Sequence, residues 1–140
     1  MHGPSAVIDK LTMLQQYTFV CAPHPLQWAA VAALDVDMSE YISAYRRKRD
    51  RVVAGLTEAG YSVVKPGGAF YVFPEVPHST RETSGTRLTG TEFVGRAIER
   101  ELLVIPGGIF SGRDTHFRIS YAASDATIER GLDVLSRLTV

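Results

Sequence analysis

The sequence predicts a single α/β domain of the α+β type, with helices packed on one side of a small, mostly antiparallel sheet. Its 140 residues are enough for one hydrophobic core and too few for two ordinary domains. Apolar stripes at helical spacing recur along the chain between short extended runs. Near the C-terminus, residues 117–121 alternate as a half-buried strand does. Phe117, Ile119 and Tyr121 share one face of this strand, and Arg118 and Ser120 share the other.

The composition is typical of a soluble globular chain, with 45% hydrophobic and 21% charged residues. Lys+Arg and Asp+Glu balance at 15 each, which argues against a nucleic-acid or membrane surface. The single cysteine, Cys21, cannot form an internal disulfide and fits a reducing compartment. Because no basic start is followed by a long apolar run, we expect a cytoplasmic protein.

Three helices are predicted before residue 60. The first is capped by Ser5, the second covers residues 26–34, and the third begins at Asp37 or Ser39 and ends at Gly60. The second helix contains no charge, so another part of this domain, another domain or another chain must cover it. If nothing covers it, an exposed apolar patch should drive the chain into dimers or larger oligomers.

The middle of the chain predicts two strands and a long loop. Residues 61–64 and 69–73 have strand character and are joined by a hairpin-like turn, Lys65-Pro66-Gly67-Gly68. Residues 74–88 are polar and without periodicity, which predicts a long loop that could also serve as a lid over a site.

The last part predicts a helix, two strands and a final helix. Thr89 and Glu92 have capping-box spacing, and Ser124 is placed to cap the final helix. Between these helices, residues 102–105 form an apolar run typical of a strand buried on both faces, which Pro106 and the following glycines end.

Arg118 is the candidate binding residue. A guanidinium in mid-strand with apolar neighbours is costly to bury without an anionic partner. Its planar fork suits a carboxylate held by two hydrogen bonds. The alternative is a strand arginine that faces solvent or pairs with a local acid. The four histidines have no metal-ligand spacing, so no metal site is expected.

The run ERELLVIPGGIF, followed by FRISYA and a closing helix, resembles the C-terminal end of the class I/II aminotransferases. These are aspartate aminotransferase-like, pyridoxal phosphate (PLP)-dependent enzymes of fold type I. The segments HGPSAVIDKL, QQYTFVCAPHPLQWAAVAAL and KPGGAFYVFP also resemble successive family segments, so the resemblance covers nearly the whole chain. It implies a C-terminal small domain, with residues 37–140 as its core and residues 1–36 facing another domain or a dimer partner.

The resemblance also implies roles for individual residues. Arg118 matches the family arginine that binds the substrate α-carboxylate. Thr18 would lie near the partner's cofactor phosphate, although it could simply be a capping or loop hydroxyl. Gly68, with Gly67, and Phe70 would border the substrate pocket, although these glycines could simply permit a tight turn and Phe70 fill the core. Two further arginines, Arg81 and Arg113, could contact a second carboxylate or form surface pairs.

The implied reaction transfers an amino group between an amino acid and a 2-oxo acid, with PLP held by a Schiff-base lysine. In the family that lysine precedes the segment that Gly3-Pro4 resembles, and Lys10, Lys48 and Lys65 do not match its context. We therefore expect a homo-oligomeric full-length enzyme with an N-terminal large domain, and a fragment that is inactive alone and catalytically silent. The alternatives are the same domain of a PLP-dependent lyase or decarboxylase, or a non-catalytic interaction domain.

Overall fold

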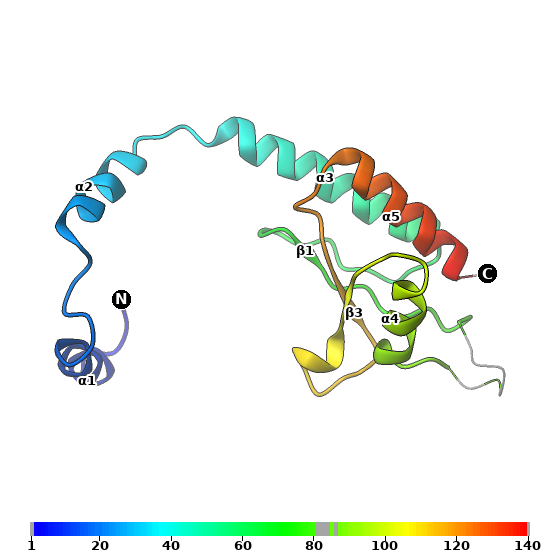
Figure 1. The fold of residues 1–140 in the computed structure, drawn as a ribbon, viewed down its shortest axis with the longest axis horizontal. Helices are drawn as coiled ribbons and strands as arrows, with labels where there is room; N and C mark the ends of the chain where they lie inside the picture. The colour runs from blue at the N-terminus through cyan, green and yellow to red at the C-terminus, as the bar shows by residue number, and fades with distance from the viewer. Residues whose placement is uncertain (1, 81–84, 86, 140) are drawn as a thin grey trace. The chain divides into compact units, whose positions relative to one another are not determined.

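The computed structural model describes residues 2–80, 85 and 87–139 (Figure 1). The chain divides into two compact units, one ending at Met38 and the other beginning at Ser39. The elements, in chain order, are α1 (Ser5–Gln16), α2 (His24–Ala33), α3 (Ser39–Glu58), β1 (Tyr71–Val72), α4 (Gly90–Ile98), β2 (Ile105–Pro106), the 3₁₀ helix η1 (Gly107–Ile109), β3 (Phe117–Ser120) and α5 (Asp125–Leu138). Among these described elements, no helix combines the length and hydrophobicity that a membrane crossing requires.

The first unit consists of α1 and α2, and each helix begins directly after a proline. Pro4 occupies the N-cap position of α1, so the prediction that Ser5 is the cap was wrong; Ser5 is the first helical residue. Helix α2 begins at His24, two residues earlier than predicted, because Pro25 lies in its first turn, where a missing N–H costs nothing. Neither helix contains a buried residue.

The apolar surface of α2 gives the first testable prediction. Trp28, Val31 and Leu34 are all more than half exposed, and Leu34 reaches 85%. Because contiguous exposed apolar surface drives association, the chain should sediment with at least twice the mass of one chain at micromolar concentration. The double substitution Trp28→Glu and Leu34→Glu should shift it towards monomer. A chain that stays monomeric across a wide concentration range would contradict the prediction.

The second unit is built on a three-stranded antiparallel sheet with the order β1-β3-β2. Helix α3 packs against α5, and α4 packs against α5 and the β2–β3 pair (Figure 1). This confirms the predicted small antiparallel sheet packed with helices. The core contains three aromatic rings in mutual contact, those of Tyr61, Phe93 and Phe117.

The predicted caps of the last two helices are confirmed. Thr89 and Glu92 form a reciprocal capping box, in which the Glu92 backbone N–H donates to Thr89 Oγ1 at 3.2 Å and the Thr89 N–H donates to the Glu92 carboxylate at 2.8 Å. Ser124 Oγ accepts from the Thr127 backbone N–H at 3.2 Å and begins α5. Both signals are local, so they could be recognised without knowledge of the tertiary structure.

The predicted hairpin of residues 61–64 and 69–73 was wrong. Residues 61–64 form no strand, and β1 pairs with β3 some fifty positions further along the chain (Tyr71 with Ser120). The reason lies in Tyr61, whose ring enters the core and whose hydroxyl donates to the Leu135 carbonyl oxygen at 2.9 Å. That insertion directs the segment towards α5 and away from a ladder with β1.

The strand predicted at residues 102–105, buried on both faces, was also wrong. Only Ile105 and Pro106 pair with β3, and Leu103 is 83% exposed. The end of α4 explains the shortening, because the Leu102 backbone N–H donates to the Ala97 carbonyl at 2.9 Å and closes the helix. The polar segment 74–88 lies partly outside the described residues, and its lid role stays a prediction.

The end of α4 supplies a second prediction. Helices α3 and α4 end with the same pattern of two backbone hydrogen bonds, and in each a residue just past the end of the helix has a left-handed conformation. That residue is Gly60 after α3 and Glu101, with φ 61°, after α4. Glu101→Gly should raise the free energy of unfolding by roughly 0.5–1 kcal/mol in urea denaturation, because glycine adopts this conformation without a steric penalty. Glu99→Gly is the control: Glu99 has φ −58°, so glycine there should destabilise the chain.

Candidate functional site

Arg118 lies on β3, the central strand of the sheet. Its partner on β2 is Ile105, and Tyr71 on β1 pairs with Ser120. Residues two apart on a strand share a face, so Tyr71 and Arg118 project from the same side of the sheet. Phe117 and Tyr121 project from the other side and are fully buried, which agrees with the alternation predicted from the sequence.

The guanidinium of Arg118 lies between two aromatic rings. Its Cζ is 4.3 Å from the ring centroid of Tyr71 and 4.1 Å from that of Phe110. The side chain is half-buried, and within the described ranges its N–H groups meet no hydrogen-bond acceptor and no carboxylate. The alternative of pairing with a local acid therefore finds no partner in that part of the chain. Arg118 is thus a partly desolvated cation whose hydrogen-bond donors face solvent or a ligand.

The ring of Phe110 is brought beside Arg118 by η1. The Phe110 N–H donates to the Gly107 carbonyl at 2.9 Å, and the Gly107 N–H donates to the His116 carbonyl at 2.8 Å. A Cβ atom at Gly107 would lie 2.7 Å from the His116 oxygen and 2.9 Å from Cζ of Phe73. Only glycine therefore allows η1 to cross so close to the start of β3.

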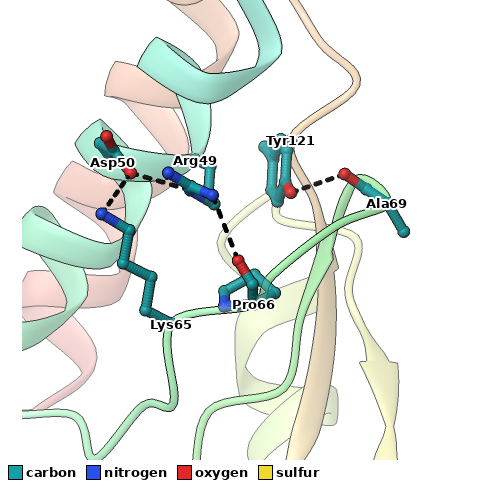
Figure 2. A network of polar contacts seen from close by, with 6 residues as sticks. All are labelled: Arg49, Asp50, Lys65, Pro66, Ala69 and Tyr121. Atoms are coloured by element: carbon teal, nitrogen blue, oxygen red, sulfur yellow. Dashed lines mark hydrogen bonds and ion pairs between the residues drawn. The ribbon is translucent and has the colours of Figure 1, made fainter. Parts of the chain in front are cut away.

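A polar network anchors the turn that carries Gly67 and Gly68 (Figure 2). Asp50 pairs with Arg49 and Lys65, each at 2.8 Å, and these two cations lower the pKa of Asp50 to about 2. Arg49 also donates to the Pro66 carbonyl at 3.4 Å.

Beyond the two glycines, the chain is fixed by Tyr121. Its hydroxyl donates to the Ala69 carbonyl at 2.8 Å, and burial raises the pKa of this hydroxyl (Figure 2). Ala69 has a φ of 58°, in the left-handed region that a Cβ atom disfavours. The turn is thus held at both ends, from α3 and from the residue that follows β3.

The structure places the other predicted site residues as follows. Phe70 packs on Tyr71, with ring centroids 4.4 Å apart, and so adjoins the Arg118 site. Gly67 and Gly68 have open space where a Cβ would lie. Thr18 belongs to the first unit, where its hydroxyl donates to the Gln15 carbonyl at 3.1 Å.

Of the two further arginines, Arg113 is exposed and Arg81 lies outside the described residues. Sequence reasoning missed Tyr71 and Phe110. The only available signals were the aromatic runs AFYVF and GGIF, which do not identify a partner.

The lysines of the chain do not fit a PLP site. Lys48 donates to the Ala123 carbonyl at 2.6 Å, Lys65 pairs with Asp50, and Lys10 is an exposed residue of α1. The cavities described, of about 260, 300 and 220 Å³, are lined by residues of α3, α5 and the neighbouring segments rather than by Arg118. In the described residues, no group of three potential ligands could hold a metal ion. Two of the three lysines are thus held by partners within the chain.

Comparison with known proteins identifies the family. The signature described as Aminotransferase class I and II matches residues 1–135. The chain belongs to this aminotransferase family. Among the relatives, it is 33% identical to an aspartate aminotransferase of Pyrococcus abyssi over 97% of its own length, and 34% identical to an aspartate aminotransferase of Rhizobium meliloti over 96%.

Solved structures of aminotransferases share the fold. The aspartate aminotransferase from Rhizobium meliloti matches with a TM-score of 0.81 and 32% identity, over 98% of this chain and 36% of its own. The aromatic aminotransferase from Pyrococcus horikoshii matches with a TM-score of 0.81 and 31% identity, over 96% and 36%. The chain spans about a third of the length of the aminotransferases it matches. The family and fold predicted from the sequence are thus confirmed.

Proposed function

We propose that this chain is the C-terminal domain of a PLP-dependent aminotransferase, in which Arg118 binds the α-carboxylate of the amino-acid and 2-oxo-acid substrates. The observation that carries the proposal is the state of the guanidinium. It is half-buried between two rings, and no acid neutralises it among the residues described. A bidentate carboxylate would supply the missing acceptors and the missing charge.

The carboxylate role accounts for the cost of placing a cation at this position. Burying part of a guanidinium without compensation lowers stability, whereas a bound carboxylate returns charge-assisted hydrogen bonds. Both substrates of amino-group transfer carry such a carboxylate beside the reacting carbon. Arg118 would thereby fix the orientation of that carbon relative to the reaction centre.

The remaining machinery would come from the rest of a longer polypeptide. PLP, when bound there, would supply the electron sink of the reaction, with a lysine of that part as its anchor. Lys48 and Lys65 are bonded elsewhere, and Lys10 lies on exposed α1, so this chain should not transfer amino groups alone. We include in the proposal a homodimer in which Thr18 contacts the cofactor phosphate bound to the partner, and Gly68 and Phe70 border the substrate pocket.

The test begins with the coding sequence upstream of the Met1 codon. The polypeptide encoded with any in-frame extension is purified with PLP and given aspartate or an aromatic amino acid, the donors named for its relatives, together with 2-oxoglutarate. Glutamate and the new 2-oxo acid should appear in equal amounts. Release of ammonia or carbon dioxide would instead support a lyase or decarboxylase. A polypeptide that neither extends upstream nor binds PLP would favour the interaction-domain alternative.

A further inference from the structure

We infer that Tyr71 and Phe110 form an aromatic clamp that holds the Arg118 guanidinium in place before any ligand arrives, so that both are positioning residues for carboxylate binding. The inference rests on the proposed role of Arg118. It adds two residues that the sequence did not single out. It also assigns them a function other than filling the core.

The clamp draws its two rings from opposite sides of the central strand. Tyr71 lies on β1, and Phe110 follows η1 directly after β2, while β3 runs between β1 and β2. The two rings reach the same guanidinium carbon at 4.3 and 4.1 Å. Both distances are well inside the reach of about 6 Å over which a cation is attracted to an aromatic face.

Each ring of the clamp is itself supported. Tyr71 is held by strand pairing with Ser120 and by the Phe70 ring, whose centroid lies 4.4 Å from its own. The Phe70 ring in turn packs near the Tyr45 ring, with centroids 6.4 Å apart. The backbone of Phe110 is held by its hydrogen bond to the Gly107 carbonyl, and its ring by the contact with Arg118. A guanidinium confined in this way has already lost much of the rotamer freedom that a free arginine loses on binding.

The exposure of the two rings argues against a purely packing role. Tyr71 is 36% exposed and Phe110 47% exposed, and neither belongs to the hydrophobic core cluster. Rings outside the core cluster gain less from burial than fully buried ones do. Both rings contact Arg118, so we expect their substitution to change the order and the ligand affinity of Arg118.

The experiment uses the complete chain, labelled with ¹⁵N, and follows the Nε–Hε signal of Arg118, assigned through its loss in Arg118→Lys. Tyr71→Leu and Phe110→Leu remove a π face and retain apolar volume. Tyr71→Phe and Phe110→Tyr retain the π face and are the matched controls. If self-association broadens the signals, the comparison is made in the Trp28→Glu and Leu34→Glu background. The readouts are the Arg118 order parameter, titration with acetate, and the melting temperature.

We expect each leucine variant to lose order at Arg118 Nε and to bind acetate about two- to tenfold more weakly, with a nearly unchanged melting temperature. Tyr71→Phe and Phe110→Tyr should retain both the order at Arg118 Nε and the affinity for acetate. Unchanged order at Arg118 in both leucine variants would overturn the clamp. Loss of order together with no response of Arg118 to acetate, even in the unsubstituted chain, would leave the clamp standing and count against the carboxylate proposal.

Discussion

Replacing Phe93 by alanine should lower the free energy of unfolding of the second unit by about 3–5 kcal/mol, the range found when a buried aromatic ring is removed from a core. Phe93 is fully buried on α4. The centroid of its ring lies 4.6 Å from that of Phe117 on β3 and 6.1 Å from that of Tyr61. Its removal therefore leaves a cavity where α4, β3 and the segment after α3 meet. A loss of this size is a large part of the stability of an ordinary domain.

Urea denaturation followed by far-ultraviolet circular dichroism measures the effect of Phe93→Ala. Ile98→Ala is the matched control, since Ile98 lies on the same helix and is 53% exposed. The control should cost less than about 1 kcal/mol because little buried surface is lost. Similar losses for the two variants would mean that α4 does not anchor the core as its contacts indicate.

Under the proposed function, Arg118→Gln should lower kcat/KM for amino-group transfer by the longer polypeptide about 30- to 5,000-fold. Truncating one partner of a buried, hydrogen-bonded charge pair costs about 2–5 kcal/mol, and each 1.36 kcal/mol corresponds to tenfold. Glutamine is polar but lacks the charge and the planar fork. Arg118→Lys keeps the charge but lacks the planar fork, so its kcat/KM should lie between those of Arg118→Gln and the unsubstituted protein.

Steady-state kinetics with an amino-acid donor and a 2-oxo-acid acceptor check this prediction. Arg130→Gln is the control, because Arg130 is an exposed arginine of α5 that is not in the sheet. Its kcat/KM should change less than about threefold if surface residues away from the site are near neutral. Equal losses for Arg130→Gln and Arg118→Gln would remove the case for a special role of Arg118.

The parts of the fold that could be predicted are those that depend on local sequence signals, each spanning a few residues. The Thr89–Glu92 box and the Ser124 cap each lie within four residues, and both were confirmed. The alternation that exposes one face of β3 at Arg118 is equally local. The pairing of β1 with β3 is not local, because α4 and η1 lie between Tyr71 and Ser120 in the sequence. The expected hairpin failed for this reason.

The candidate site divides in the same way. Arg118 could be singled out because a cation in mid-strand is unusual by itself. Tyr71 and Phe110 could not, since their position beside it depends on the register of β1 and on the close approach at Gly107. The roles of Thr18, Gly68 and Phe70 remain predictions.

The two ends of the turn around Gly67 and Gly68 differ in how they are fastened. The α3 end is held by the half-exposed Asp50–Lys65 pair and by the Arg49 hydrogen bond to Pro66, whereas the other end is held by the hydroxyl of buried Tyr121. Dissolved salt screens exposed charges and barely affects a neutral hydrogen bond at a buried ring. Ionic strength should therefore weaken the attachment of the turn to α3 more than its attachment at Ala69.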